Sequence, residues 1–256
     1  MVRNQTKFLQ PSLFDSPEIL QSDKIERIKM QTFIDVKMRN VEKQNLRYEN
    51  LHLSKGMTFT NPNGFPQMKP FNGEIPPFSK IYPYTMRASA EGVNCGLHFF
   101  VRDSYFANSL WNDLERKTVS LSRFDVLFTP DYSLFVNPPL PFVNKMSIYK
   151  KCFCGAFWQL CGLNVISTAS YGDVNSFSYC YEGLPENGII AIGNETVRMR
   201  DPASVVLWQM AVRELERQKH PTLIIIYGKR IEVPGLHTPV AYFPGYIETH
   251  FRNGRF

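Results

Sequence analysis

The chain has 256 residues, of which 43% are hydrophobic and 20% are charged, and its formal net charge is +6. This apolar content supplies one substantial core, which argues against wholesale disorder, and no apolar run reaches the roughly 18 residues of a membrane-spanning helix. The basic excess suits an acidic partner such as nucleic acid, and it equally suits a protein that is merely basic.

The five cysteines are scattered, at positions 95, 152, 154, 161 and 180. An odd set in a chain of this length argues against a secreted disulfide scaffold, and the N-terminus has no apolar signal region. The spacing of Cys152, Cys154 and Cys161 matches neither zinc sites nor the common iron–sulfur sites. We therefore expect thiols that pack in the core of a protein in a reducing cytoplasm.

Residues 1–55 are polar and basic with helical patterning, and we expect them to form a partly helical N-terminal arm. Ser16 and Pro17 are a typical N-cap and first helical residue. Lysines and arginines alternate with acids further along, as in a solvated helix face or in a helix that contacts DNA. The candidate nucleic-acid-binding residues are Lys24, Arg27, Lys29, Lys37 and Arg39.

Within this arm, the stretch QPSLF (10–14) places an adjacent Leu and Phe on a polar terminus. One interpretation is local packing at the helix entrance. The hydrophobic staple that would explain such packing needs an apolar residue directly before the N-cap, and Phe14 lies one position too early. The other interpretation is a short linear motif that a partner protein binds.

Residues 56–94 are rich in Pro, Gly and Asn, which interrupt regular structure repeatedly. We expect an irregular connector here that wraps the core with its aromatic side chains. The pattern becomes regular from about residue 95, so residues 95–256 are the predicted core domain.

Five apolar runs in the core domain are predicted strands, and helix-length segments separate them. The runs show no alternation of apolar and polar residues, which is typical of parallel strands buried on both faces. They are LHFFV (97–101), VLF (126–128), VIS (165–167), IIAI (189–192) and LIII (223–226). We expect an α/β fold with a mainly parallel sheet of about five βα units. An open doubly wound sheet and a partial or distorted barrel both fit, and PVAYF (239–243) is a candidate edge strand.

Four helices are predicted between these strands. Ser104 is the expected cap of the first, which runs through residues 109–118, and an amphipathic helix over about 143–162 ends at Gly162. A short helix is expected around residues 176–184. Asp201 and Pro202 open the last helix, which runs to about residue 220.

A charged residue follows each predicted strand. These residues are Asp103, Asp131, Asp173, Glu195 and Lys229. Since parallel strands place their carboxyl ends on one edge of a sheet, we expect the five to share a rim and treat them as candidate catalytic residues. Such a set suits Mg²⁺ binding through oxygen ligands, or acid–base work on a nucleotide, nucleic-acid or glycosidic bond.

The competing explanation is helix capping, because Asp is a common N-cap and loops after strands are polar in any fold. Asp103 and Asp173 directly precede predicted helices, so capping alone accounts for them. The chain also lacks the tight signatures of serine hydrolases, P-loop proteins and dinucleotide-binding proteins. Both interpretations therefore stay open.

Five short stretches carry a family resemblance. They are TPDYS (129–133), GAFWQ (155–159), SYGD (170–173), SFSYCYEGLP (176–185) and YGK (227–229), with a weaker echo at HFFVRD (98–103). Together they resemble an uncharacterised domain-of-unknown-function family of bacteriophages, plasmids and other mobile elements. Tyr171 departs from the Trp expected in the family. The resemblance covers roughly the C-terminal half and implies a phage or mobile-element setting in a bacterial cytoplasm, without a defined chemistry.

In that setting, the stretch 10–14 resembles the peptide by which bacterial polymerases and repair proteins bind the DNA sliding clamp. Leu13 and Phe14 would fill an apolar pocket, and Gln10 would fix the register through hydrogen bonds. Pro11 lowers the conformational entropy lost on binding because its φ is already restricted.

Three functions remain open from the sequence. The first is a phage or mobile-element protein of DNA replication or DNA metabolism, recruited through the sliding clamp and in contact with DNA. The second is a hydrolase that uses the strand-end carboxylates, with or without Mg²⁺. The third is a non-catalytic interaction protein, such as a host-takeover or anti-defence factor.

Overall fold

The structure, a computed structural model, describes residues 48–71, 73, 80–90, 94–138, 140 and 142–245. The candidate clamp-binding residues Gln10, Leu13 and Phe14 lie outside the described residues. So do the five basic residues predicted to contact nucleic acid. Both predictions therefore stay predictions.

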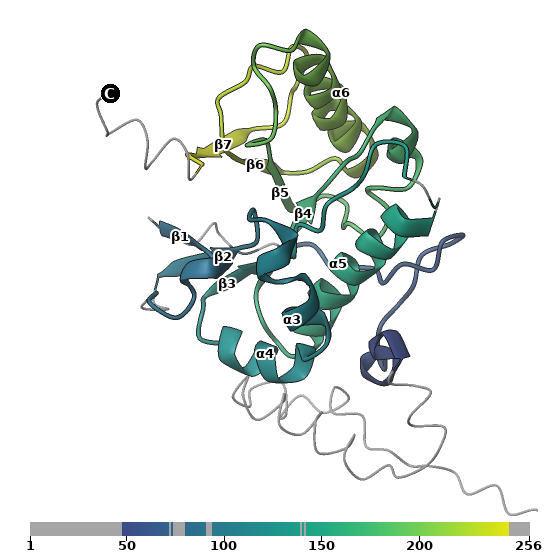
Figure 1. The fold of residues 1–256 in the computed structure, drawn as a ribbon, viewed down its shortest axis with the longest axis vertical. Helices are drawn as coiled ribbons and strands as arrows, with labels where there is room; N and C mark the ends of the chain where they lie inside the picture. Colours follow the sequence, from purple (N-terminus) through teal and green to yellow (C-terminus); the bar gives the residue numbers. More distant parts are fainter. Residues whose placement is uncertain are drawn as a thin grey trace, which may run out of the picture.

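Seven parallel strands form one sheet, and their spatial order is their order along the chain (Figure 1). They are β1 (Lys80–Pro83), β2 (Cys95–His98), β3 (Val126–Phe128), β4 (Val165–Ala169), β5 (Ile189–Gly193), β6 (Leu223–Tyr227) and β7 (Val240–Phe243). The sheet curls into a half-barrel whose edges are β1 and β7. The predicted mainly parallel α/β fold is thus confirmed. Of the two arrangements that fitted the sequence, it is the partial barrel, because a doubly wound sheet reverses its strand order.

Two strands lie outside the five βα units. β7 is the edge strand expected at residues 239–243, and it pairs with β6 from Val240 to Phe243. β1 falls inside the stretch expected to be an irregular connector, and it pairs with β2 over its whole length. Its four residues end in Pro83, which an edge strand tolerates because a proline needs no ladder partner there. The sheet therefore begins at Lys80 rather than near residue 95.

The helices of the described residues are η2 (Tyr48–Leu53), η3 (Tyr84–Met86), η4 (Asp103–Tyr105), α3 (Ala107–Trp111), α4 (Leu114–Leu121), α5 (Phe142–Leu160), η5 (Val174–Ser178) and α6 (Pro202–Lys219). α5 and α6 match two of the predicted helices, and Asp201 caps α6 by accepting hydrogen bonds from two backbone N–H groups of its first turn. The short helix expected near residue 176 is η5.

The single helix expected after Ser104 is wrong, because this segment folds as three short helices, η4, α3 and α4. Asn112 and Asp113 lie between α3 and α4, and the backbone of Asp113 is not helical. Both residue types hydrogen-bond locally and favour turns over helix interiors. Ser104 lies inside η4 and caps no helix.

The helical side of the sheet has two apolar clusters, and α5 contributes to both. Phe153 and Trp158 pack in the cluster with α3 and α4, whereas Ile148 and Ala156 pack in the cluster with α6. All five cysteines are buried, as predicted, and none of them forms a disulfide. Because it packs in both clusters, α5 is apolar around most of its circumference and serves as the central element of the core.

The other face of the sheet carries a third apolar cluster. Its buried members are Phe100, Val126, Phe128, Ile166, Ile189, Ala191, Ile225 and Tyr227. They alternate along β3, β5 and β6 with residues that face the helices. Burial on both faces explains why these strands are continuous apolar runs in the sequence.

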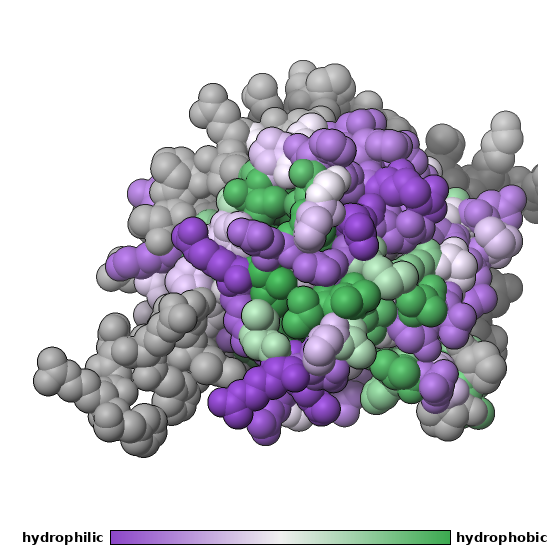
Figure 2. Space-filling model, turned by 90° about the horizontal axis from the view of Figure 1, so that it is seen from above, coloured by the Kyte–Doolittle hydropathy of each residue, from purple (hydrophilic) through white to green (hydrophobic). Residues whose placement is uncertain are grey.

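Figure 2 looks onto the end of the molecule that carries α6, and apolar side chains gather in the middle of this face with hydrophilic ones around them. Val206 and Met210 are exposed on α6. Among the helices that the structure describes, none is both long and apolar enough to cross a membrane.

Candidate functional site

A cavity of about 390 Å³ opens at the carboxyl ends of β3, β4 and β5, against the first turns of α6. Its lining residues are Asp131, Tyr132, Ser133, Leu134, Ala169, Ser170, Tyr171, Gly172, Gly193, Thr196, Val197, Ser204 and Leu207. The strands are parallel, so the residues that follow them meet at one edge of the sheet. The cavity therefore lies where the strand-end pattern predicted a functional surface.

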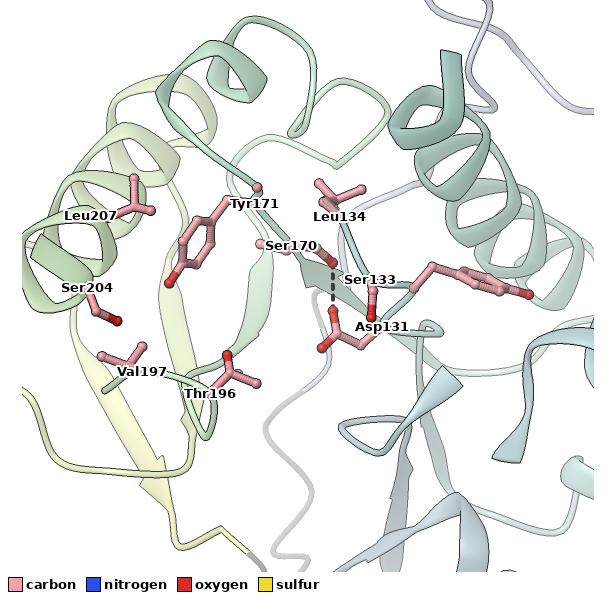
Figure 3. A pocket seen from close by; sticks show the side chains of 13 residues that line it. Asp131, Ser133, Leu134, Ser170, Tyr171, Thr196, Val197, Ser204 and Leu207 are labelled. Atoms are coloured by element: carbon pink, nitrogen blue, oxygen red, sulfur yellow. Dashed lines mark hydrogen bonds between the residues drawn. The ribbon is translucent and has the colours of Figure 1, made fainter. Parts of the chain in front are cut away.

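Asp131 and Ser170 form the polar centre of this cavity (Figure 3). Ser170 follows β4, and its Oγ donates a hydrogen bond of 2.6 Å to Oδ1 of Asp131, which follows β3. The second carboxylate oxygen of Asp131 makes no hydrogen bond to another described residue. This oxygen is therefore available to a ligand in the cavity.

Lys151 completes a chain of three polar groups from behind the cavity wall. Its side chain projects from α5, is buried, and donates from Nζ to Oγ of Ser170 over 3.0 Å. Burial lowers the pKa of Lys151. Gly155, one turn further along α5, lets the helix lie close to Met68 and Thr129, since a side chain there would collide with both.

Burial raises the pKa of Asp131 from 3.8 to about 6. The hydrogen bond from Ser170 and the charge of Lys151 oppose this rise, whereas the negative charge of Asp103 adds to it. The carboxyl group therefore changes its protonation state close to neutral pH, which is the property of a general acid or base.

Asp103 lies beside this centre and fixes the loop after β3. Its two carboxylate oxygens accept hydrogen bonds from the backbone N–H of Ser133, at 3.1 Å, and from the Ser133 hydroxyl, at 3.0 Å. It does not cap η4 through its side chain. Asp103 and Asp131, from neighbouring strand ends, are thus brought together by the fold.

The other three strand-end residues are not part of the cavity lining. Asp173 caps η5 by accepting hydrogen bonds from the backbone N–H groups of Asn175 and Ser176. Lys229 donates from Nζ to the backbone carbonyls of Glu195, at 2.7 Å, and Val197, at 2.6 Å. Helix capping therefore explains Asp173, and the contacts of Lys229 hold the backbone of the loop after β5. The prediction that the five strand-end residues are catalytic stays a prediction.

Glu195 does not line the cavity either, and its side chain lies against the backbone that follows β7. Its carboxylate is so close to Gly245 that a side chain at this glycine would collide with it. The neighbouring residue, Thr196, lines the cavity instead.

Hydroxyl groups surround the remaining walls. Tyr171, Thr196 and Ser204 present their oxygens toward the open space in Figure 3. Burial, and then the charge of Asp131, raise the pKa of Tyr171 to about 12, so this phenol is a protonated donor. The Ser204 oxygen accepts from the backbone N–H of Arg198, over 3.0 Å, and keeps its own proton to donate.

Gly193 is the cavity residue contributed by the end of β5. A side chain at this position would collide with the ring of Phe100 on the curled face of the sheet. Glycine therefore lets the aromatic cluster approach β5 closely next to the cavity.

Of the residues that line this cavity, the strand-end pattern predicted Asp131 and missed Lys151 behind its wall and the hydroxyl residues Thr196 and Ser204. A signal for Lys151 was present, because it lies three residues after Ile148 and four before Gly155, both on the buried face of α5. Thr196 and Ser204 had no comparable signal, since a lone hydroxyl in a loop or a helix start is common.

Mg²⁺ prefers several oxygen ligands, and the fold brings only Asp103 and Asp131 near each other at this rim. Across the described ranges, no group of three or more His, Cys, Asp or Glu residues is arranged to hold a metal ion. Mg²⁺ use therefore stays a prediction.

Comparisons with known proteins give relatives in two phages. The chain is 28% identical to the Gene 1 protein of Mycobacterium phage L5 over 198 residues, which cover 76% of this chain and 85% of that protein. It is 30% identical to the Gene 1 protein of Mycobacterium phage D29 over 151 residues, which cover 59% of this chain and 55% of that protein. No solved structure matches.

These relatives support the phage setting that the sequence motifs implied. A family model, the domain of unknown function DUF4417, matches residues 57–239, which include β1 through β6 and the whole cavity lining. The matched region extends well upstream of the C-terminal half that carries the family motifs. The chain therefore belongs to the DUF4417 family.

Proposed function

We propose that this phage-related protein is a hydrolase in which Asp131 acts as the general base. The observation that carries this proposal is the chain of hydrogen bonds from Lys151 through Ser170 to Asp131 in the cavity wall. A carboxyl group with a pKa of about 6 accepts and returns protons efficiently at neutral pH.

The proposed step uses one water molecule. Ionised Asp131 removes a proton from the water while the oxygen of the water forms a bond to the electrophilic carbon of the substrate. The bond from that carbon to the leaving group breaks, and Asp131 returns the proton to the departing atom. Ser170 orients the carboxylate through its hydrogen bond, and Lys151 holds the Ser170 hydroxyl in place.

The test is a hydrolysis screen with the full chain. Chromogenic nitrophenyl glycosides, esters and phosphates are incubated with the protein, and positive classes are followed with unlabelled compounds. We expect turnover that Asp131→Asn reduces about 100- to 10,000-fold, the usual contribution of a general base. Asp113→Asn is the matched control, because Asp113 is a carboxylate that pairs with the exposed Arg116.

The proposal fails if both variants retain full turnover, or if no class of substrate is hydrolysed. The second result would favour the non-catalytic interaction role that the sequence left open. Circular dichroism of each variant verifies that a loss of turnover is not a loss of folding.

A second function is favoured by the sequence of the arm. We propose that QPSLF (10–14) recruits the protein to the bacterial DNA sliding clamp, with Leu13 and Phe14 as paired apolar anchors and Gln10 as the register-setting group. The basic residues of the arm would then lie near DNA, which places the protein in DNA replication or metabolism within the host cytoplasm.

A pull-down with purified clamp tests this recruitment. We expect the full chain to bind and the Leu13→Ala/Phe14→Ala variant to lose binding. The chain also offers a matched control in Phe8 and Leu9, an adjacent apolar pair just before the stretch. If Phe8→Ala/Leu9→Ala binds no better than the first variant, or if all three proteins bind equally, QPSLF is not the anchor.

A further inference from the structure

The cavity offers a ligand mostly hydroxyl groups. Neither Tyr171 nor Thr196 makes a side-chain hydrogen bond within the described part of the chain, and both oxygens face the cavity in Figure 3. Ser204 has a free proton, and Asp131 has a free carboxylate oxygen. A hydroxyl group both donates and accepts, so this set pairs naturally with the hydroxyls of a polyol.

The described lining contains no lysine or arginine. The nearest ammonium group, that of Lys151, is buried behind Ser170 and engaged with its oxygen. Lys229 is held by two backbone carbonyls. Asp131 is therefore the one residue of this lining that carries a formal charge at neutral pH, and that charge repels anions.

Backbone amides are the other common partners of phosphate, and several of them around the cavity already have an acceptor within the protein. Asp201 accepts from the N–H groups of Ala203 and Ser204 at the start of α6. The N–H of Ser133 donates to Asp103, and that of Gly172 donates to the Ser176 hydroxyl. These amides have no hydrogen left for a phosphate oxygen.

The size of the cavity and its apolar walls limit the class of ligand further. The volume of about 390 Å³ lies near the lower end of small-molecule sites. Leu134, Val197 and Leu207 add apolar surface between the hydroxyl groups (Figure 3). Such a mixture fits a molecule with one hydroxylated edge and one flat apolar face.

From these observations we infer that the cavity binds an uncharged, hydroxyl-bearing small molecule of the sugar or nucleoside class, and that it discriminates against phosphate esters. The inference rests on the proposed hydrolase and names its substrate class. Among the bonds considered from the sequence, it selects a glycosidic bond over a phosphate bond.

The test is calorimetric titration of the full chain at pH 7.5 with four nucleosides, four monosaccharides, and the monophosphate of each. At this pH Asp131, with its pKa of about 6, is ionised. We expect at least one neutral compound to bind at least tenfold more tightly than its own phosphate. Phosphates that bind as tightly as their neutral parents, or no binding by any neutral compound, would overturn the inference.

Two variants test whether the neutral compound binds in this cavity. Thr196→Val and Tyr171→Phe each remove one hydroxyl and keep the shape, so each should weaken binding of the neutral compound about two- to tenfold. Thr222→Val is the matched control, on an exposed threonine that is not part of the cavity lining. Equal affinities for all three variants would show that the ligand binds elsewhere and would also overturn the inference.

A variant that adds a positive charge tests the preference for neutral compounds in the opposite direction. Thr196→Lys adds a cation to the wall and should shift preference toward the phosphate form. The hydrolase proposal is judged separately, by the turnover of Asp131→Asn. If phosphates prove to be the preferred ligands while Asp131→Asn still abolishes turnover, the substrate class is wrong and the hydrolase stands.

Discussion

Two parts of the same sheet edge carry the same sequence feature and use it differently. At the ends of β3 and β4, Asp131 and Ser170 meet in the cavity wall and connect to buried Lys151. At the ends of β5 and β6, Lys229 is occupied with the carbonyls of Glu195 and Val197. A charged residue after an apolar strand therefore marks the edge of the sheet, but its role depends on what the neighbouring loop presents to it.

The difference arises from the connections. The loop after β3 returns through α5, whose Lys151 supplies a buried positive charge to the β3–β4 end. The loop after β5 turns back on itself, and Asn194 exchanges two hydrogen bonds with the backbone of Lys229. One end thus holds a titratable group beside open space, whereas the other closes two loops against each other.

Activity should separate the two ends most strongly. Asp131→Asn is expected to lower turnover about 100-fold or more, whereas Glu195→Gln should change it less than about threefold. Steady-state kinetics on the same substrate measures both. A larger loss in Glu195→Gln would move the catalytic centre to the β5–β6 end.

The pH dependence of stability is the next largest effect. The folded pKa of Asp131, about 6, exceeds its ordinary value of 3.8, so its contribution to stability is complete below about pH 3.8 and is lost as the pH rises through 6. The Asp131→Asn variant cannot ionise at this position, so it does not lose this stability. Between pH 4 and pH 7 the free energy of unfolding of the variant, measured in urea, should therefore rise relative to that of the wild type by on the order of 2 kcal/mol. A constant difference across this range would contradict the raised pKa.

Lys229→Met should destabilise the β5–β6 end by about 2 kcal/mol, because two carbonyls lose a charged donor. Its turnover per folded molecule should stay close to that of the wild type. Urea unfolding and kinetics at a temperature well below the transition test the two statements. Unchanged stability would mean that these hydrogen bonds do not hold the loops together.

Asp173 distinguishes capping from catalysis with two substitutions. Asp173→Ala should cost about 1 kcal/mol of stability, whereas Asp173→Asn should cost little, since Asn is an equally good N-cap. Both variants should retain turnover. A large loss of turnover in Asp173→Asn, with stability unchanged, would return this residue to the catalytic set.

The smallest effect is a pair of opposite shifts in the pH profile. The charge of Lys151 lowers the pKa of Asp131 and that of Asp103 raises it. Lys151→Met should therefore move the ascending limb of kcat/KM to higher pH, and Asp103→Asn should move it to lower pH. Shifts in the same direction would show that these two charges do not act on Asp131 as the geometry requires.

The sequence predicted the fold class well because its strands are buried on both faces. Continuous apolar runs predicted β3 to β6 directly, whereas the run LHFFV (97–101) overlaps β2 (Cys95–His98) only at Leu97 and His98. The start of α6 at Asp201 and Pro202 could be predicted from capping chemistry alone. β1 was missed because four residues ending in proline, within a segment rich in breakers, have no local strand signal. The break between α3 and α4 was not predicted, because the segment has the length and pattern of one helix although it contains the turn-forming residues Asn112 and Asp113.

For the site, the sequence by itself determined which residues would reach the carboxyl edge of the sheet, since a parallel α/β order fixes that edge. It did not determine which of those residues would face open space. Asp131 faces a cavity, Asp173 caps η5, and Lys229 binds carbonyls. The roles of Asp131 and Lys229 depend on contacts between residues that are 19 to 39 positions apart, such as Lys151 with Ser170 and Ser170 with Asp131. Only the tertiary structure decides them, because local patterns carry no information on which loops pack together.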